Sequence, residues 1–326
     1  MKNHIRRDIL NNNSFPKYGI LVATKNRPKE IYYFLESVSN LSILPSEIVI
    51  SSSGENIKYI LEKFTTLLKI THVHSQISGQ VHQKKIGLKA FKKTLEWIAF
   101  FDDDIILMPN SIENIFCDIN SLPNADKVVG VGFSDSGFVY PKNSKTYDFF
   151  SKIFFSSQSV KGKVNKSGYN SSYMGVEKIL ETNWLNGASI WKSNYALSYD
   201  VKLDTVPHAI GEDLIFSYRI NKCGTLIFSP GSKFIFQNSS AKNGSLDFYR
   251  TQLYIQFYFV LLNPEFSVFA FYWRTLGNSF YYLLFAHENQ LNLKENLSGI
   301  YKTLSDIFML IIKNSTSEYV LKNRIE

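Results

Sequence analysis

The chain contains 326 residues, of which 44% are hydrophobic and 20% are charged. This length permits one large domain or two ordinary ones, and this composition excludes an intrinsically disordered chain. The net charge of +8 suggests a phosphate-bearing partner, but no zinc finger, RNA-recognition signature or compact arginine block accompanies it, so we expect no nucleic acid.

Two features of the sequence indicate a cellular compartment. The two cysteines, Cys117 and Cys223, cannot form a disulfide framework, which favours a reducing environment. Residues 1–8 carry basic side chains without the apolar run of a signal peptide. We therefore expect a cytoplasmic protein.

Strands alternate with helices over the first 135 residues. Residues 18–24 are apolar up to Thr24, which is typical of a buried parallel strand. Pro28 then begins a predicted helix with apolar residues at helical spacing. Further strands are predicted at 47–50, near 70–73 and at 97–101, with helices through 57–64 and 81–95 between them.

This alternation predicts an α/β fold with a Rossmann-like, mostly parallel sheet flanked by helices. Ligands of such sheets bind beyond the carboxyl ends of the strands. Thr24, the small residues 51–54 and the aspartates 102–104 all fall at that edge.

The rest of the chain changes character twice. Residues 136–175 are rich in Ser, Lys, Asn, Gly and Tyr and are expected to form a flexible loop insertion, either a functional lid or a solvated surface segment. Between residues 247 and 286, fifteen of forty side chains are aromatic. We therefore expect a domain over 1–245 and a helical C-terminal region over 246–326.

The aromatic region allows two interpretations. Its longest run without a charge, residues 251–264, has 14 residues, fewer than the ~20 that span a bilayer. Pro264, Glu265 and Arg274 interrupt the apolar stretches. The helices either complete the core or lie at a membrane surface.

Two acidic motifs are candidates for chemistry. Asp102, Asp103 and Asp104 directly follow an apolar strand, and three adjacent carboxylates are costly to ionise unless a cation holds them. Oxygen ligands without a nearby His or Cys cluster suit Mg²⁺ or Mn²⁺, although an acidic solvated turn is the alternative. Glu212 and Asp213 open a helical stretch, where the helix dipole alone would favour acidic residues.

Five segments in order resemble the glycosyltransferase family 2 enzymes of the GT-A fold, over about residues 18–237. They are 22–28 (VATKNRP), 79–87 (GQVHQKKIG), 101–109 (FDDDIILMP), 184–189 (WLNGAS) and Glu212-Asp213 with Arg219. Two positions depart from the family pattern. Residues 51–54 (SSSG) stand where an acidic residue usually contacts the base, and Gln237 stands near a frequent metal-binding histidine.

The resemblance implies a metal-dependent inverting glycosyltransferase. Asp213, or else Glu212, would take the proton from an acceptor hydroxyl. Mn²⁺ or Mg²⁺ bound by Asp104 and Asp102 would neutralise the leaving diphosphate of a nucleotide-diphospho-sugar, expected to be UDP-linked. The implied donor-binding residues are Ala23, Thr24, Arg27, Ser52, Lys84, Lys85, Asp102 and Asp103, and the implied acceptor residues are Asn186 and Gly187.

The expected acceptor is a glycan or a lipid-linked glycan in bacterial surface polysaccharide synthesis, with peripheral contact at the inner face of the membrane if the aromatic region meets lipid. Two alternatives stay open. A nucleotidyltransferase would also use paired aspartates and a metal, but residues 23–27 lack its Gly-rich phosphate loop. A non-catalytic sugar-nucleotide-binding or scaffold protein is compatible with the departures at residues 51–54 and Gln237, whereas the intact aspartates 102–104 and Asp213 argue against it.

Overall fold

The computed structural model describes residues 15–92, 94–139, 149, 151–156, 160–204, 206, 210–237, 246–285, 293–313 and 316–322. The basic residues 1–8, on which the expected compartment partly depends, lie outside the described residues. The strands are β1 (Tyr18–Lys25), β2 (Glu47–Ser53), β3 (Ile70–Ser75), β4 (Trp97–Asp102), β5 (Ile105–Leu107), β6 (Val128–Asp135), β7 (Leu180–Thr182), β8 (Ser189–Lys192) and β9 (Thr225–Phe236). The helices are α2 (Pro28–Ser39), α3 (Lys58–Leu61), α4 (Gln80–Leu88), α5 (Ser111–Asn120), α7 (Ser193–Leu197), α8 (Glu212–Asn221), α9 (Leu246–Leu262), α10 (Val268–Phe285), α11 (Leu293–Ile312) and α12 (Ser317–Val320).

All nine strands belong to one mixed sheet. Its order is β3-β2-β1-β4-β8-β6-β9-β5, and β7 pairs with β9. The strands from β3 to β4 are parallel, as the sequence predicts. β8 is antiparallel to both β4 and β6 because it starts beside the carboxyl end of β4, where Ser189 pairs with Phe100, and runs back from there. The predicted α/β architecture with a central sheet flanked by helices is confirmed.

The continuously apolar sequence of β1 follows from burial on both faces of the sheet. Ile20 and Val22 join a core cluster with Phe34 of α2 on one face. Leu21 joins a second cluster with Val81 of α4 on the other face. Successive side chains of a strand point to opposite faces, so a strand covered on both sides needs no polar alternation.

Two expected elements differ from those observed. The helix predicted over 81–95 ends at Leu88, and the chain then returns to the sheet, where Glu47 accepts a hydrogen bond from the backbone N–H of Lys92. Of the segment 184–189, which resembles a strand of the family, only Ser189 belongs to a strand. The residues before it form a loop whose approach to the end of β4 is described below.

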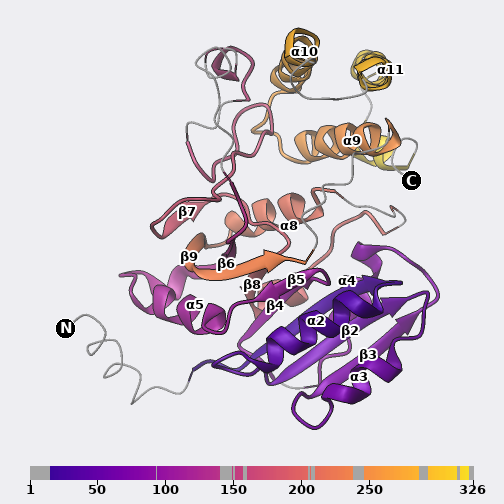
Figure 1. Ribbon diagram of the computed structural model, residues 1–326. Helices are drawn as coiled ribbons and strands as arrows, with labels where there is room; N and C mark the ends of the chain where they lie inside the picture. The colour runs from indigo at the N-terminus through magenta and orange to yellow at the C-terminus, as the bar shows by residue number, and fades with distance from the viewer. Residues whose placement is uncertain are drawn as a thin grey trace.

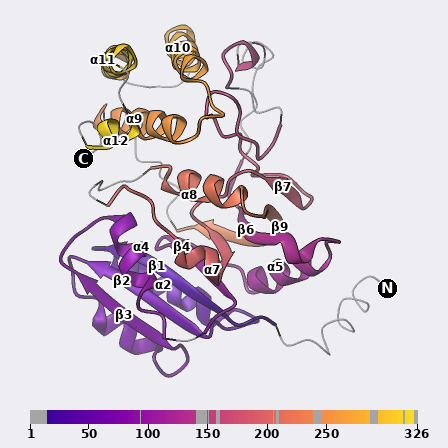
Figure 2. The same cartoon turned by 180° about the vertical axis from the view of Figure 1, so that it is seen from behind.

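The C-terminal helices stack above α8, with α9 between α8 and the pair α10 and α11 (Figures 1 and 2). Tyr254, Phe257 and Phe259 of α9 are buried, so this helix completes the core. The described part of 136–175 packs against the same layer: the backbone N–H of Ser267 donates to the carbonyl of Lys166. Within the described residues, no helix combines the length and the apolar character needed to cross a membrane.

Candidate functional site

The ends of β1, β2 and β4 bring three of the predicted segments to one edge of the sheet. The register pairs Ala23 with Asp102 and Thr24 with Ser52. In a parallel sheet this edge is where ligands bind. The donor-binding residues predicted on these strands are therefore neighbours in space, while their role remains a prediction.

Arg27 joins two of the three aspartates. Its Nη1 atom lies 2.8 Å from Oδ1 of Asp103 and 3.0 Å from Oδ2 of Asp104. The hydroxyl of Thr24 donates to Asp103 at 2.6 Å. Burial raises the pKa of Asp103 to about 6, against the lowering effect of Thr24 and Arg27. Asp104 keeps 28% of its side chain exposed and Asp103 only 7%, so Asp104 is the more accessible of this pair to a ligand.

Asp102 contacts α4 and the loop before β8. The amide of Gln80 donates to its Oδ1 atom at 3.0 Å. A Cβ atom on Gly187 would lie 2.9 Å from its Oδ2 atom, so a side chain there would force the carboxylate to move. Burial raises the pKa of Asp102, and the positive charge of Lys84 opposes that rise.

Lys84 and Glu212 form a buried ion pair beneath this edge. Their side chains are 2% and 5% exposed, and Lys84 donates to Oε1 of Glu212. The hydroxyl of Tyr199 donates to the other carboxylate oxygen. Burial lowers the pKa of Lys84, but the charges of Glu212, Asp102 and Asp213 and the hydrogen bond to Glu212 together outweigh this and hold it above its usual value. Glu212 is therefore occupied by two donors.

Lys85, the next residue, points to a different surface. Its Nζ atom lies 2.6 Å from Asp204 and 3.6 Å from Asp200. The two lysines predicted to bind the donor thus both pair with carboxylates of the chain, one in the core and one near the surface.

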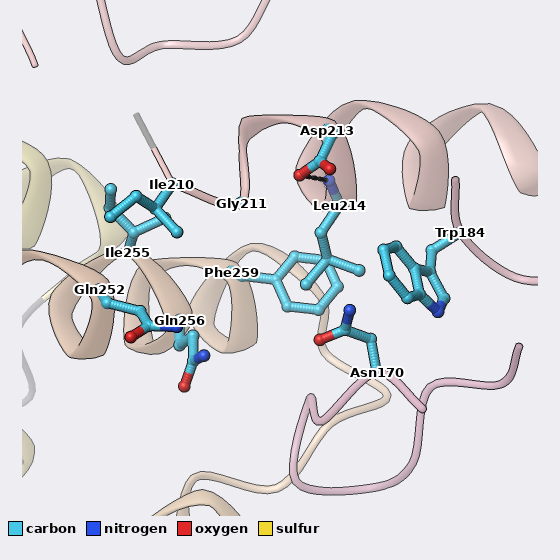
Figure 3. Close-up of a pocket in the computed structure, with 10 residues that line it drawn as sticks. All are labelled: Asn170, Trp184, Ile210, Gly211, Asp213, Leu214, Gln252, Ile255, Gln256 and Phe259. Carbon is cyan, nitrogen blue, oxygen red and sulfur yellow. Dashed lines mark hydrogen bonds between the residues drawn. The ribbon is translucent and has the colours of Figure 1, made fainter. Parts of the chain in front are cut away.

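Asp213 opens α8 and lies in the wall of a cavity of about 220 Å³ (Figure 3). Gly211 precedes the helix with φ +91°, a left-handed conformation that favours glycine. Burial, and then the neighbouring charge of Glu212, raises the pKa of Asp213 to about 7. A carboxylate of this kind ionises near neutral pH, as a general base requires. The cavity is lined by Asn170, Trp184, Ile210, Gly211, Asp213, Leu214, Gln252, Ile255, Gln256 and Phe259.

The predicted acceptor residues lie beside Asp213. Asn186 and Gly187 line a narrow space together with Lys84, Glu212 and Asp213. The backbone N–H of Asn186 donates to the hydroxyl of Tyr173 at 2.7 Å. The Oδ1 atom of Asn186 is buried and has no hydrogen-bond partner within the described part of the chain.

Ser52 meets a pair of histidines that the sequence analysis did not single out. Its hydroxyl lies 2.8 Å from Nε2 of His72 and 3.1 Å from Nδ1 of His74. Both histidines lie on β3 at a spacing of two, which places them on one face of the strand. Burial and the charge of His74 lower the pKa of His72.

Two glutamines of α4 were also missed. Gln80 holds Asp102, and the buried Gln83 donates to the carbonyls of Thr24 at 2.7 Å and Ser51 at 2.9 Å. With Lys84 they occupy positions i, i+3 and i+4, which share one face of a helix. That spacing of polar residues is the signal from which the sequence could have identified them.

The fit of a divalent metal ion rests on the aspartates. The negative charge of Asp104 contributes to the raised pKa of Asp102. Gln237 follows β9 beside them, and its backbone N–H donates to the carbonyl of Asp104 at 2.7 Å. Across the described ranges, no three His, Cys, Asp or Glu side chains are grouped to hold a metal ion. Two carboxylates fit Mg²⁺ or Mn²⁺ when substrate phosphates complete the coordination.

Comparisons with known proteins give the family and the fold. Residues 19–182 match the family model described as glycosyl transferase family 2. No curated protein matches the chain by sequence.

Solved structures show a similar fold. The S. aureus TarS fragment 1–349 in complex with UDP-GlcNAc aligns with a TM-score of 0.52 and 12% identity, over 95% of this chain and 88% of that one. The same fragment in complex with UDP aligns with a TM-score of 0.50 and 11% identity, again over 95% of this chain and 88% of that one. The mannosyltransferase PcManGT from Pyrobaculum calidifontis, in complex with GDP-Man and Mn²⁺, aligns with a TM-score of 0.48 and 14% identity. This alignment covers 96% of this chain and 86% of that one. At these identities, the two TarS alignments are evidence for the fold alone.

Proposed function

The chain belongs to glycosyl transferase family 2, and on this basis we propose that it is a metal-dependent inverting glycosyltransferase with Asp213 as its general base. The family and the fold make it a transferase that uses a nucleotide-sugar. The observation that carries the finer proposal is the position of Asp213 at the start of α8, in the wall of a cavity and with a pKa raised to about 7.

The acceptor would bind in the cavity with one hydroxyl at the Asp213 carboxylate. Asp213 takes the hydroxyl proton while the oxygen attacks the anomeric carbon of the donor. The bond from that carbon to the diphosphate breaks with its electron pair on the leaving oxygen, so the nucleoside diphosphate departs and the anomeric centre is inverted.

The donor would lie at the strand ends, against Ala23, Thr24, Arg27 and Ser52. A Mn²⁺ or Mg²⁺ ion held by Asp104 and Asp102 would supply charge neutralisation for the diphosphate. We propose a UDP-linked sugar as the donor, on the basis of the family resemblance.

Glu212 is less suited than Asp213 to act as the base. Its two oxygens accept hydrogen bonds from Lys84 and Tyr199 in the buried ion pair. Its proposed role is to hold Lys84 close to Asp213, because the positive charge of Lys84 lowers the pKa of Asp213. Glu212 is then a positioning residue.

The test uses two variants with different expected losses. Asp213→Asn should keep donor binding and lose turnover by about two to four orders of magnitude, because the base is gone. Asp104→Ala should lose the Mn²⁺-dependent binding of the nucleotide, measured by calorimetry with UDP and GDP. Asp126→Asn, at an exposed aspartate, is the matched control and should change neither turnover nor nucleotide binding. A nucleotidyltransferase would release pyrophosphate instead of a nucleoside diphosphate, and a scaffold protein would show no turnover in any variant.

We also propose that α10 and α11 make peripheral contact with a membrane, which would bring the enzyme to a lipid-linked glycan of bacterial surface polysaccharide synthesis. Phe269 and Tyr301 are each 75% exposed, and Phe308 and Ile312 are 50% and 61% exposed. Tyr301, Phe308 and Ile312 recur at helical spacing, so they form a stripe along α11.

Vesicle sedimentation tests the membrane contact. Phe308→Asp combined with Ile312→Asp should abolish binding to anionic vesicles, whereas Tyr59→Asp, at an aromatic residue 51% exposed on α3, should not. Wild-type protein that fails to sediment with vesicles would refute the contact and favour a soluble glycan as the acceptor.

A further inference from the structure

Arg274 is a buried cation without a carboxylate partner among the described residues. It lies on α10 with 2% of its surface exposed. Its guanidinium carbon lies 5.5 Å from the ring centre of Tyr169 and 5.2 Å from that of Phe271. Such contacts with ring faces stabilise a cation, but only by about 0.5–2 kcal/mol.

The hydrogen bonding of Arg274 is also incomplete. Nη2 donates to Oε1 of Gln256 at 2.6 Å, while Nε is buried and has no hydrogen-bond partner within the described ranges. Burial lowers the pKa of Arg274 to about 10, which still leaves the side chain protonated at neutral pH. A buried charge costs several kcal/mol unless it is paired. The chain keeps this charge where none of its described carboxylates neutralises it.

Gln256 connects Arg274 to the cavity that contains Asp213. A guanidinium group can only donate, so the amide oxygen of Gln256 must face Arg274. The two N–H groups of Gln256 are then left to donate elsewhere, and no hydrogen bond joins them to another described residue. Gln256 lines the cavity from α9, whereas Asp213 lines it from α8 (Figure 3).

The cavity therefore has a hydrogen-bond acceptor on one wall and hydrogen-bond donors on another. Asp213 offers a carboxylate that accepts a proton, and Gln256 offers N–H donors backed by the charge of Arg274. Trp184 and Phe259 add apolar surface to the same lining. A sugar ring with a hydroxyl at Asp213 and an anionic group at Gln256 would match both.

We propose that the cavity beside Asp213 is the acceptor site and that it selects an acceptor carrying an anionic group, a phosphate or a carboxylate, through Gln256 and Arg274. This inference rests on the proposed function, since it assigns the acceptor of that reaction. It adds the acceptor's chemical class and two residues that the sequence motifs do not include.

The decisive variant is Gln256→Glu, which gives Arg274 a carboxylate partner inside the chain. Because it pairs a buried cation, it should fold and should raise the melting temperature. Gln252→Glu is the matched control: it places the same charge on the same helix and in the same cavity, one turn away from Gln256, which is the residue that accepts the hydrogen bond from Arg274. The probes are glucose 6-phosphate, glucuronate and glucose, with excess UDP and GDP present to fill the donor site.

Saturation-transfer NMR should show that wild-type protein binds at least one anionic probe roughly ten-fold more tightly than glucose. Gln256→Glu should remove that preference, and Gln252→Glu should retain most of it. A preference for glucose 6-phosphate identifies a phosphate acceptor, and one for glucuronate identifies an acidic sugar.

Equal binding of all three probes to wild-type protein would overturn the inference. So would an equal loss of the anionic preference in Gln256→Glu and Gln252→Glu. Nucleotide binding in Asp104→Ala keeps this outcome separate from the fate of the proposed function. If UDP or GDP binds through Asp104 but the anionic preference is missing, only the acceptor assignment is wrong. If no nucleotide binds, the proposed reaction is wrong as well.

Discussion

Removing Lys84 should destabilise the protein far more than removing Lys85, the residue beside it. Lys84 and Glu212 are 2% and 5% exposed, so Lys84→Met leaves an uncompensated carboxylate in the core. Breaking a buried pair in this way costs about 3–5 kcal/mol. Glu212 keeps its hydrogen bond from Tyr199, which places the expected cost at about 3 kcal/mol, the lower end of that range.

The double variant Lys84→Met with Glu212→Gln measures the pair itself. Both charges are then absent, and the introduced amide oxygen can still accept the hydrogen bond from Tyr199, so we expect a recovery of about 2 kcal/mol relative to Lys84→Met. Lys85→Met is the control. Its partner Asp204 is 39% exposed, and a pair near the surface contributes only about 0–1 kcal/mol.

Guanidinium chloride unfolding, followed by fluorescence and by circular dichroism, measures these differences. The two probes must give the same midpoint for the free energies to be compared. Equal losses for Lys84→Met and Lys85→Met would refute the reasoning, because burial would then not decide the cost. So would a double variant whose loss is the sum of the two single losses.

Three further results are expected. Turnover at saturating donor should rise with pH through about 7, because Asp213 must lose its proton to act, and Lys84→Met should move this limb to higher pH; a flat profile from about pH 5 to 9 would exclude Asp213 as the base. Gly187→Ala should cost about 1–3 kcal/mol of stability because its Cβ meets Asp102, whereas Gly231→Ala, with ordinary contact distances, should stay within about 0.5 kcal/mol in the same unfolding assay. Arg27→Gln should weaken nucleotide binding in calorimetry roughly ten-fold, since it removes a cation beside the proposed position of the diphosphate; unchanged affinity would remove Arg27 from the proposed donor site.

The parallel half of the fold was predictable because its signals are local. The apolar run before Thr24 and the run before Asp102 each identify a strand, and the alternation with helices predicts that these strands are parallel. Acidic residues mark the start of α8 in the same way, whereas the role of Asp213 came from the family resemblance and stays a prediction. The part of the sheet that contains antiparallel strands was harder to predict from the sequence, because the pairing of β8 with β4 depends on a loop that returns to the end of β4.

The candidate site was predictable as a set of segments and not as a set of contacts. Neither the sequence around Lys84 nor that around Glu212 shows that they meet, because each taken alone resembles an ordinary charged residue of a helix. Arg274 illustrates the same limit: along the sequence it interrupts an apolar stretch, and only the folded chain places it behind Gln256. Helix 81–95 was predicted too long because propensity alone does not report the hydrogen bond that Glu47 accepts from the backbone after Leu88.

The ion pair of Lys84 and Glu212 also has a consequence for synthesis of the chain. The partners are 128 positions apart. At a translation speed of about 5–20 residues per second, roughly 6 to 26 seconds separate their appearance at the ribosome. During that interval α4 cannot settle in its buried position without enclosing an unneutralised ammonium group. We therefore expect the nascent N-terminal half to keep the apolar face of α4 exposed until α8 is made, so that a polypeptide stalled before residue 212 is a target for chaperones and proteases.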